Sequence, residues 1–292
     1  MLTANAWALS LGPAIFMVQN VVPGQPLDVK KKAKVAFVVT NDTDLNRQYS
    51  LTCEKPSLSM ADWEKGYEEI PDPTWFKLEQ NEFIVPAKKS VEVGLIIDVP
   101  NKPEYFNCKW MLAVVLTTGK SKGIGVGLAI ASRVQIETAR SYDASSGGAA
   151  PIAVIPCTEV VKGKPGAAFE KSFLIKNNSG RDLECVPERL VQVYATEEFK
   201  YPRYTTPGCQ PLLKESWFKA APEKFSVKAG EKHEVKIAGT IPETAKIGEK
   251  WEELVFITAP AVKPGDKGPA GRETRTFFRV IYEVTAVEAK AN

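Results

Sequence analysis

Histidine is almost absent from this chain. His233 is the only one among 292 residues, so a Ser-His-Asp or Cys-His arrangement would have to use it, and no nucleophile-elbow sequence is present. The five cysteines include no Cys-x-x-Cys pair, which leaves none of the usual zinc-ligand spacings. From these absences we expect a protein that is not an enzyme and that holds no metal and no cofactor.

Long apolar runs and a strong net charge are lacking as well. Residues 9–22 are largely apolar, but Gly12-Pro13 and Gln19-Asn20 interrupt the stretch, and it is too short to span a bilayer. The net charge is only +3, without the clustered basic face of a nucleic-acid-binding protein. The densest basic stretch, Lys30-Lys31-Lys32 with Lys34, is expected to be a solvated edge strand that its lysines protect from pairing.

The first residues contain a weak export signal. Ala4-Asn5-Ala6 resembles the end of a signal peptide, although no basic segment and apolar core precede it. On this basis we expect an extracytoplasmic protein, in the periplasm or at the cell surface. In such a protein Cys53 could bridge Cys108, and Cys185 could bridge Cys209 or Cys157. Five buried thiols in a reducing compartment are the alternative, and the sequence leaves both open.

Helical periodicity is also missing, because apolar residues mostly recur with a period of two. Two β-rich segments stop at turn clusters, at residues 40–43 and 176–180. The 21 prolines and 20 glycines divide the chain into strand-length pieces. The pattern therefore predicts an all-β fold of β-sandwiches. Further strands are expected at residues 90–99, 110–118, 127–137, 231–239, 251–258 and 277–287, and one helical turn at 60–65.

The two halves of the chain repeat one another. Trp75-Phe76-Lys77 recurs as Trp217-Phe218-Lys219 at an offset of 142 (217 − 75), and the register holds to Pro100 and Pro242. Upstream the offset is 136 (173 − 37), which places an insertion in the second copy near residues 194–211. A repeat of this length indicates tandem domains. We expect one domain at residues 1–138, a flexible linker at 139–150 and a second domain at 151–292.

Three motifs that suggest chemistry have simpler explanations. Gly119-Lys120-Ser121 would end a phosphate-binding loop only with a glycine five positions before Gly119, where Val114 stands. A hairpin tip explains it better. The sequences that start at Asn41 and Asn177 match the N-glycosylation pattern, but they also suit turns, which we prefer. The tryptophans at 75, 110, 217 and 251 repeat with the domains, which favours packing over ligand binding.

The order of these motifs resembles a known class of domain. Leu11-Gly12-Pro13 leads to Pro23-Gly24, and Val154-Ile155-Pro156 leads to Pro165-Gly166. A strand with a turn follows, then a tryptophan, and then a step such as Phe83-Ile84-Val85-Pro86. This order resembles bacterial immunoglobulin-like surface and periplasmic domains, namely those of WxL-associated surface proteins and, more weakly, of pilus chaperones. The resemblance implies two tandem immunoglobulin-like β-sandwiches in an exported, non-enzymatic protein.

The resulting hypothesis is a structural or adhesive subunit of an extracytoplasmic assembly, such as a surface layer, an appendage or a filament. It would bind other protein subunits, including copies of itself, through strand edges and loops, and residues 7–22 are the expected donor strand. A carbohydrate is a second class of partner for an exposed aromatic side chain. The alternative is a periplasmic chaperone or ligand-binding module. The expected partner contacts are Trp7, Ile15, Phe16, Trp63, Tyr67, Tyr201 and Tyr204.

Overall fold

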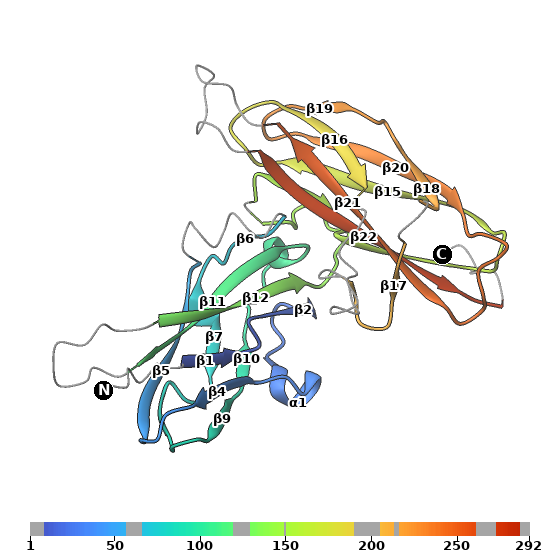
Figure 1. The fold of residues 1–292 in the computed structure, drawn as a ribbon. Helices are drawn as coiled ribbons and strands as arrows, with labels where there is room; N and C mark the ends of the chain where they lie inside the picture. Colours follow the sequence, from blue (N-terminus) through green and yellow to red (C-terminus); the bar gives the residue numbers. More distant parts are fainter. Residues whose placement is uncertain are drawn as a thin grey trace, which may run out of the picture. The chain divides into compact units, whose positions relative to one another are not determined.

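The computed structural model describes residues 9–56, 66–118, 129–148, 150–189, 205–212, 216–260 and 273–286. The chain divides into two compact units, and the strands of each are drawn in Figure 1. Unit 1 comprises Met1–Lys102 and Lys109–Ala139, and unit 2 comprises Pro103–Cys108 and Arg140–Asn292. Each unit is a β-sandwich of two layers, as the period-two pattern predicts.

One layer of unit 1 is a six-stranded sheet with the order β2-β12-β11-β5-β8, in which β6 also pairs with β11. The other layer consists of two three-stranded sheets, β1-β4-β9 and β3-β10-β7, divided where Gly94 separates β9 from β10. The bounds are β1 Leu9–Gly12, β2 Ile15–Val21, β3 Leu27–Asp28, β4 Phe37–Asn41, β5 Arg47–Glu54, β6 Glu68–Glu69, β7 Phe76–Leu78, β8 Glu82–Val85, β9 Ser90–Val93, β10 Leu95–Ile97, β11 Lys109–Thr118 and β12 Ala129–Thr138.

Unit 2 repeats this arrangement with fewer interruptions. Its six-stranded sheet has the order β14-β22-β21-β16-β19 with β17 beside β21, and its four-stranded sheet has the order β13-β15-β20-β18. The bounds are β13 Ile152–Ile155, β14 Thr158–Gly163, β15 Ala168–Asn177, β16 Leu183–Arg189, β17 Gln210–Pro211, β18 Phe218–Ala221, β19 Phe225–Val227, β20 Lys232–Thr240, β21 Lys250–Ala259 and β22 Thr274–Val284. The described residues also form the helix α1, Val29–Ala33, and two short 3₁₀ helices, η1 Pro73–Trp75 and η2 Pro103–Tyr105.

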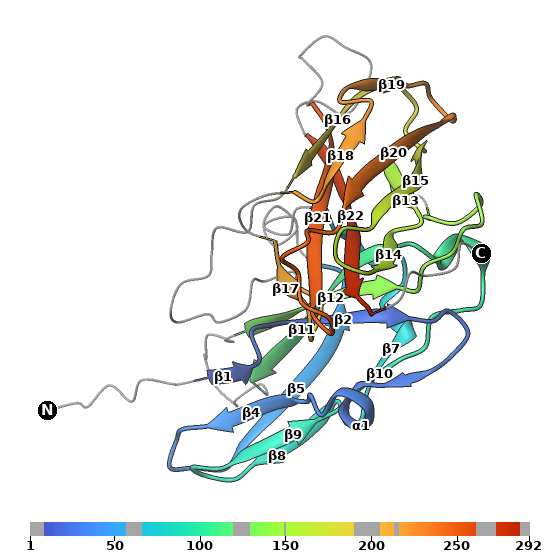
Figure 2. The same cartoon turned by 90° about the vertical axis from the view of Figure 1, so that its right-hand side faces the viewer.

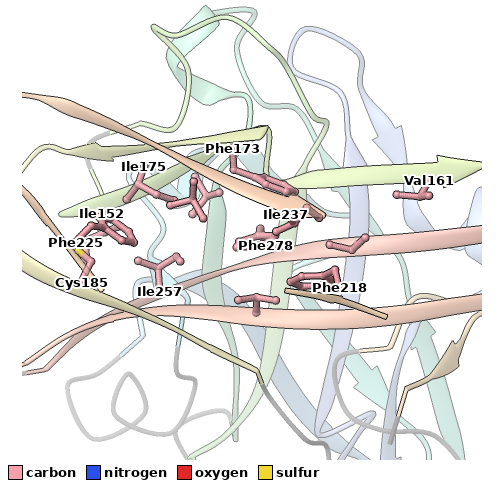
Figure 3. Close-up of a cluster of buried hydrophobic side chains, with 14 of the residues drawn as sticks. Ile152, Val161, Phe173, Ile175, Cys185, Phe218, Phe225, Ile237, Ile257 and Phe278 are labelled. Carbon is pink, nitrogen blue, oxygen red and sulfur yellow. The ribbon is translucent and has the colours of Figure 1, made fainter. Parts of the chain in front are cut away.

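The core of each unit lies between its two layers. In unit 2 the rings of Phe173 from β15 and Phe278 from β22 face one another at 4.0 Å, within the apolar cluster that Figure 3 shows. The repeated tryptophans meet in the same way in both copies. Trp75 and Trp110 lie 5.7 Å apart, and Trp217 and Trp251 lie 5.8 Å apart. The prediction that these four rings pack inside the domains is confirmed.

The lysine-rich stretch forms a helix, so the prediction of an edge strand was wrong. Helix α1 (Val29–Ala33) begins at Asp28, whose carboxylate accepts a hydrogen bond from the Lys31 amide at 2.9 Å, and ends at Lys34 in the left-handed region. Because that amide stabilises the charged carboxylate, the pKa of Asp28 is lowered. A capped helical turn with lysines in its last turn is favoured by the helix dipole.

Helix α1 also explains the change of offset in the repeat. Leu27 pairs with Ile97 as Phe169 pairs with Gly239, an offset of 142 (169 − 27). Phe37 and Phe173, the next equivalent pair, differ by only 136. Unit 1 therefore carries six extra residues at α1. Unit 2 has six extra residues of its own between β16 and β17. Glu68 and Gln210 are therefore equivalent again at an offset of 142 (210 − 68). This position agrees with the predicted insertion.

One buried asparagine locks the same turn in each unit. The Asn41 amide donates to the carbonyl oxygens of Leu45 and Val85 at 2.8 and 2.9 Å, and its carbonyl oxygen accepts from Thr43. Asn177 makes the equivalent bonds to Arg181, Val227 and Ser179. Both asparagines are at most 1% exposed. Their side chains satisfy turn backbone groups that would otherwise be buried without partners, which supports the turn interpretation of both motifs.

The segment expected to be a flexible linker is tied into unit 2. Asn107, which is buried, donates to the Ser141 carbonyl and the Ser146 hydroxyl, both at 2.6 Å, and accepts from the Ser141 and Cys157 amides. These bonds hold residues 103–108 against residues 141–157 within the same unit. Unit 1 ends at Ala139. The flexibility of the segment stays a prediction, and these hydrogen bonds do not support it.

Candidate interaction surface

The outer strand β8 presents an open edge of the six-stranded sheet in unit 1. It pairs with β5 in antiparallel register, Ile84 opposite Gln48 and Glu82 opposite Ser50. No strand in the described part of the chain pairs with its other side, and β8 lies at the lower periphery of unit 1 in Figure 2. An unpaired strand edge can accept a strand from a partner.

The hydrogen-bond pattern shows which backbone groups face this open side. The Leu51 amide donates to the Asn81 carbonyl at 2.8 Å, so the pair at 51 and 81 is a bonded pair of the ladder. Bonded and non-bonded pairs alternate in an antiparallel ladder, which makes the Ile84–Gln48 and Glu82–Ser50 pairs non-bonded. The amide and carbonyl groups of Ile84 and Glu82 therefore point away from β5, toward the open side.

Two exposed apolar side chains accompany the edge. Ile84 is 62% exposed, and Leu45, in the turn before β5, is 66% exposed. The turn lies against the end of β8, because the Asn41 amide reaches both the Leu45 and the Val85 carbonyls. Large apolar side chains this exposed beside unpaired backbone groups form an adhesive edge. We call Leu45, Ile84 and the strand β8 the unit 1 edge.

Unit 2 has the same edge without the apolar side chains. Arg181 stands at the position of Leu45 (181 − 45 = 136), and Ser226 stands at the position of Ile84 (226 − 84 = 142). The Ser226 hydroxyl donates to the Glu184 carboxylate, which also pairs with Lys224 at 3.4 Å. Edges in stable β-proteins are commonly blunted by charge. The unit 2 edge carries the ion pair of Glu184 on β16 and Lys224 directly before β19, whereas in unit 1 the ion pair of Lys88 and Asp44 lies in the turns beside β8.

The expected donor strand is already paired within unit 1. Strand β1 lies antiparallel to β4, and β2 lies parallel to β12 with Ile15 opposite Arg133 and Phe16 opposite Val134. The Phe16 ring also contacts Phe37 at 5.5 Å. The prediction that residues 7–22 form a free donor was therefore wrong for the described residues from Leu9 onward. The Phe16 ring packs in the sandwich, and Ile15 is half-buried on the paired strand β2.

Tyr67 lies inside unit 1, which corrects the expectation of an exposed ring. It is 8% exposed, and its hydroxyl donates to Glu137 at 2.6 Å and contacts the Met17 sulfur at 3.5 Å. The remaining expected contacts lie outside the described residues, as does the tip of the hairpin between β11 and β12 at residues 119–128. They are Trp7, Trp63, Tyr201 and Tyr204.

The ionisable residues show no catalytic arrangement in the described parts of the chain. His233 lies on β20 opposite Ile175 of β15 and stacks on Phe225 at 4.5 Å. No group of three or more His, Cys, Asp or Glu side chains could hold a metal ion among the residues that the structure describes. In those same residues, no helix is long and apolar enough to cross a membrane.

All five cysteines are free thiols, so neither expected bridge is present. Cys108, Cys157, Cys185 and Cys209 are buried, and Cys53 is half-buried. Burial raises the pKa of the Cys53 thiol to about 12, and the pKa values of Cys185 and Cys209 to about 11. Since the thiolate is the reactive form, these three side chains are unreactive core residues at neutral pH.

Unit 2 contains a buried ionic cluster next to the end of its insertion. Arg279 and Glu252, each about 1% exposed, form a direct ion pair, and Thr206 donates to the same carboxylate. Glu253, the residue after Glu252, forms an ion pair with Arg189 at 2.7 Å. Burial raises the pKa of Glu253. The cluster fastens residues 205–212 to β21 and offers no open site.

Comparisons with known proteins find similar solved structures but no family. No family model matches the chain, and no curated protein matches its sequence. Among solved structures, it is similar to a Porphyromonas gingivalis W83 protein of unknown function, at 14% identity over 94% of this chain and 99% of that one, with a TM-score of 0.34. The E. coli chaperone DraB matches at 10% identity over 92% and 98%, with a TM-score of 0.31.

A third match is the complex of the Salmonella enterica SafA pilin with the SafB chaperone, at 9% identity over 92% and 95%, with a TM-score of 0.30. At such identities the likeness concerns the fold alone. The chain itself consists of two units, each a two-layer β-sandwich, and the similar structures include chaperones. The resemblance to WxL-associated surface proteins finds no support among these comparisons.

Proposed function

We propose that this chain is a non-enzymatic, extracytoplasmic protein that binds other protein subunits by strand addition at the unit 1 edge. The observation that carries the proposal is the contrast between equivalent edges of one chain. Leu45 and Ile84 leave the edge of unit 1 apolar and open, whereas Arg181 and Ser226 make the edge of unit 2 polar. The backbone is the same in both, so the difference lies in the side chains.

The role of the bound subunit separates two versions of this function. A structural or adhesive subunit of a surface layer, appendage or filament would keep its partner within a polymer. A periplasmic chaperone, as the similar protein SfaE is, would hold one subunit in a one-to-one complex. The mass of the complex purified from cells distinguishes the two versions.

Making the unit 1 edge resemble the unit 2 edge is expected to abolish binding. The double variant Leu45→Arg/Ile84→Ser carries side chains that the same backbone already accepts in unit 2, so its stability should change by no more than about 0.5 kcal/mol per site. On an array of nine-residue peptides with alternating apolar and polar residues, the native chain should bind a subset that the variant does not bind. The array includes residues 80–88 of this chain.

The control is the reverse exchange in unit 2, Arg181→Leu/Ser226→Ile, combined with the polar unit 1 edge. This variant moves the apolar pair to the other domain and should regain strand binding there only in part, because Lys224 and Glu184 remain. Equal peptide binding by the native chain and by Leu45→Arg/Ile84→Ser would contradict the proposal, as would the lack of any binding by the native chain.

A further inference from the structure

The charges on either side of β8 are complementary to those of a second β8 in antiparallel orientation. Glu82 begins the strand, and Lys88 follows its end, where its side chain is 61% exposed, pairs with Asp44 at 3.2 Å and donates to the Asp42 carbonyl. When two such strands run antiparallel, the acidic start of each lies at the basic end of the other. Opposite charges across neighbouring strands stabilise a pair, and like charges destabilise it.

We infer that the unit 1 edge pairs with the same edge of a second copy of this chain, through a two-fold axis at Ile84. This inference rests on the proposed function and names its partner. Ile84 is the natural centre because its amide and carbonyl face the open side, so the two copies can exchange both hydrogen bonds there. In this register Phe83 lies opposite Val85 of the other copy.

The same register brings the remaining features of the edge together. The exposed Ile84 side chains of the two copies lie side by side on one face of the joined sheet. Glu82 lies opposite Pro86 of the other copy, where the turn that carries Lys88 begins. Pro86 has no amide to donate, and its carbonyl already accepts from the Lys89 amide, so the pairing is limited to residues 83–85 of each copy. A two-fold contact of this kind closes on itself and gives a dimer.

The unit 2 edge cannot pair with itself in the equivalent way. A two-fold axis at Ser226 would place Lys224 opposite Lys228 of the other copy, twice in each dimer. Such directly opposed like charges are destabilising, and Glu184 also holds Ser226 and Lys224 in place. The chain therefore contains one self-complementary edge and one self-repelling edge on the same backbone.

A disulfide at the axis tests this pairing. In a bonded antiparallel pair the two Cα atoms are about 5.5 Å apart, within the range that a disulfide spans. With oxidised glutathione as the oxidant, the full chain carrying Ile84→Cys should form a linked dimer. The matched variant Ser226→Cys and the native chain should form no disulfide-linked dimer, because four of the five native cysteines are buried and Cys53 is half-buried.

A second variant keeps the inference falsifiable without a new thiol. Glu82→Lys makes both ends of the edge basic and should raise the dissociation constant of the dimer about tenfold, equivalent to about 1.4 kcal/mol, in sedimentation at increasing protein concentration. If Ile84→Cys gives no dimer, or Glu82→Lys leaves association unchanged, the two-fold pairing is overturned. Peptides other than residues 80–88 would then still report whether the edge binds strands, so the proposed function is judged separately.

Discussion

Replacing Arg279 with methionine is expected to lower the free energy of unfolding of unit 2 by about 3–5 kcal/mol. Arg279 and Glu252 lie on the face of β21 and β22 opposite the core, yet both are almost fully buried. Without the guanidinium, the Glu252 carboxylate would remain buried beside the amide and hydroxyl of Thr206, which donate to it. Hydrogen exchange of β21 peptides, read by mass spectrometry, measures the loss within unit 2.

The equivalent residue of unit 1 provides the control. Arg133 takes the place of Arg279 beside Met111, which stands where unit 2 has Glu252. Arg133→Met therefore leaves no buried carboxylate at this position, and its effect on unit 1 should be much smaller. Similar destabilisation by both substitutions would mean that packing of the arginine stem, and not the ion pair, stabilises this face.

Replacing either locking asparagine with alanine is expected to destabilise its own unit by about 2–4 kcal/mol. Asn41→Ala removes the donors for the Leu45 and Val85 carbonyls, and Asn177→Ala removes those for Arg181 and Val227. In each case buried backbone groups lose their partners. Hydrogen exchange resolved by peptide should show faster exchange in the mutated unit and little change in the other.

The neighbouring exposed residue serves as the control for this pair. Asp42→Ala changes the same turn without touching the buried bonds, and it should alter the stability by no more than about 0.5 kcal/mol. Equal effects of Asp42→Ala and Asn41→Ala would show that the turn tolerates the loss of its lock. A large effect in one unit only would show that the two turns are not equivalent in energy.

Much of the fold could be predicted because its signals are local or repeated. Alternating apolar residues and turn clusters indicated the strands, and the Trp-Phe-Lys repeat indicated two similar units with an insertion in the second. Helix α1 was missed because five residues carry no helical period. The signals of this helix are the aspartate that caps its first turn and the lysines in its last turn. Lysines are equally typical of a strand at the edge of a sheet, which is why the pattern predicts an edge strand.

The interaction surface was within reach of the sequence but was not recognised. Aligning the repeats at both offsets matches Leu45 with Arg181 and Ile84 with Ser226. Each position is apolar in the first repeat and polar in the second, which indicates that the two edges differ in polarity. What the sequence could not show is that these positions are exposed and share one edge, since that depends on the pairing of β8 with β5. Tyr67 illustrates the opposite case, because its burial depends on Glu137, 70 residues away.

The central claim is that unit 1 binds protein partners through the outward backbone groups of β8. The most direct test is amide hydrogen exchange resolved at single residues, with and without a saturating strand peptide. The account predicts that the Ile84 amide, which faces the open side, exchanges at least about tenfold more slowly in the complex, equivalent to about 1.4 kcal/mol of protection, while the Ser226 amide of unit 2 is unchanged. Unchanged exchange at Ile84, or equal slowing at Ser226, would contradict it.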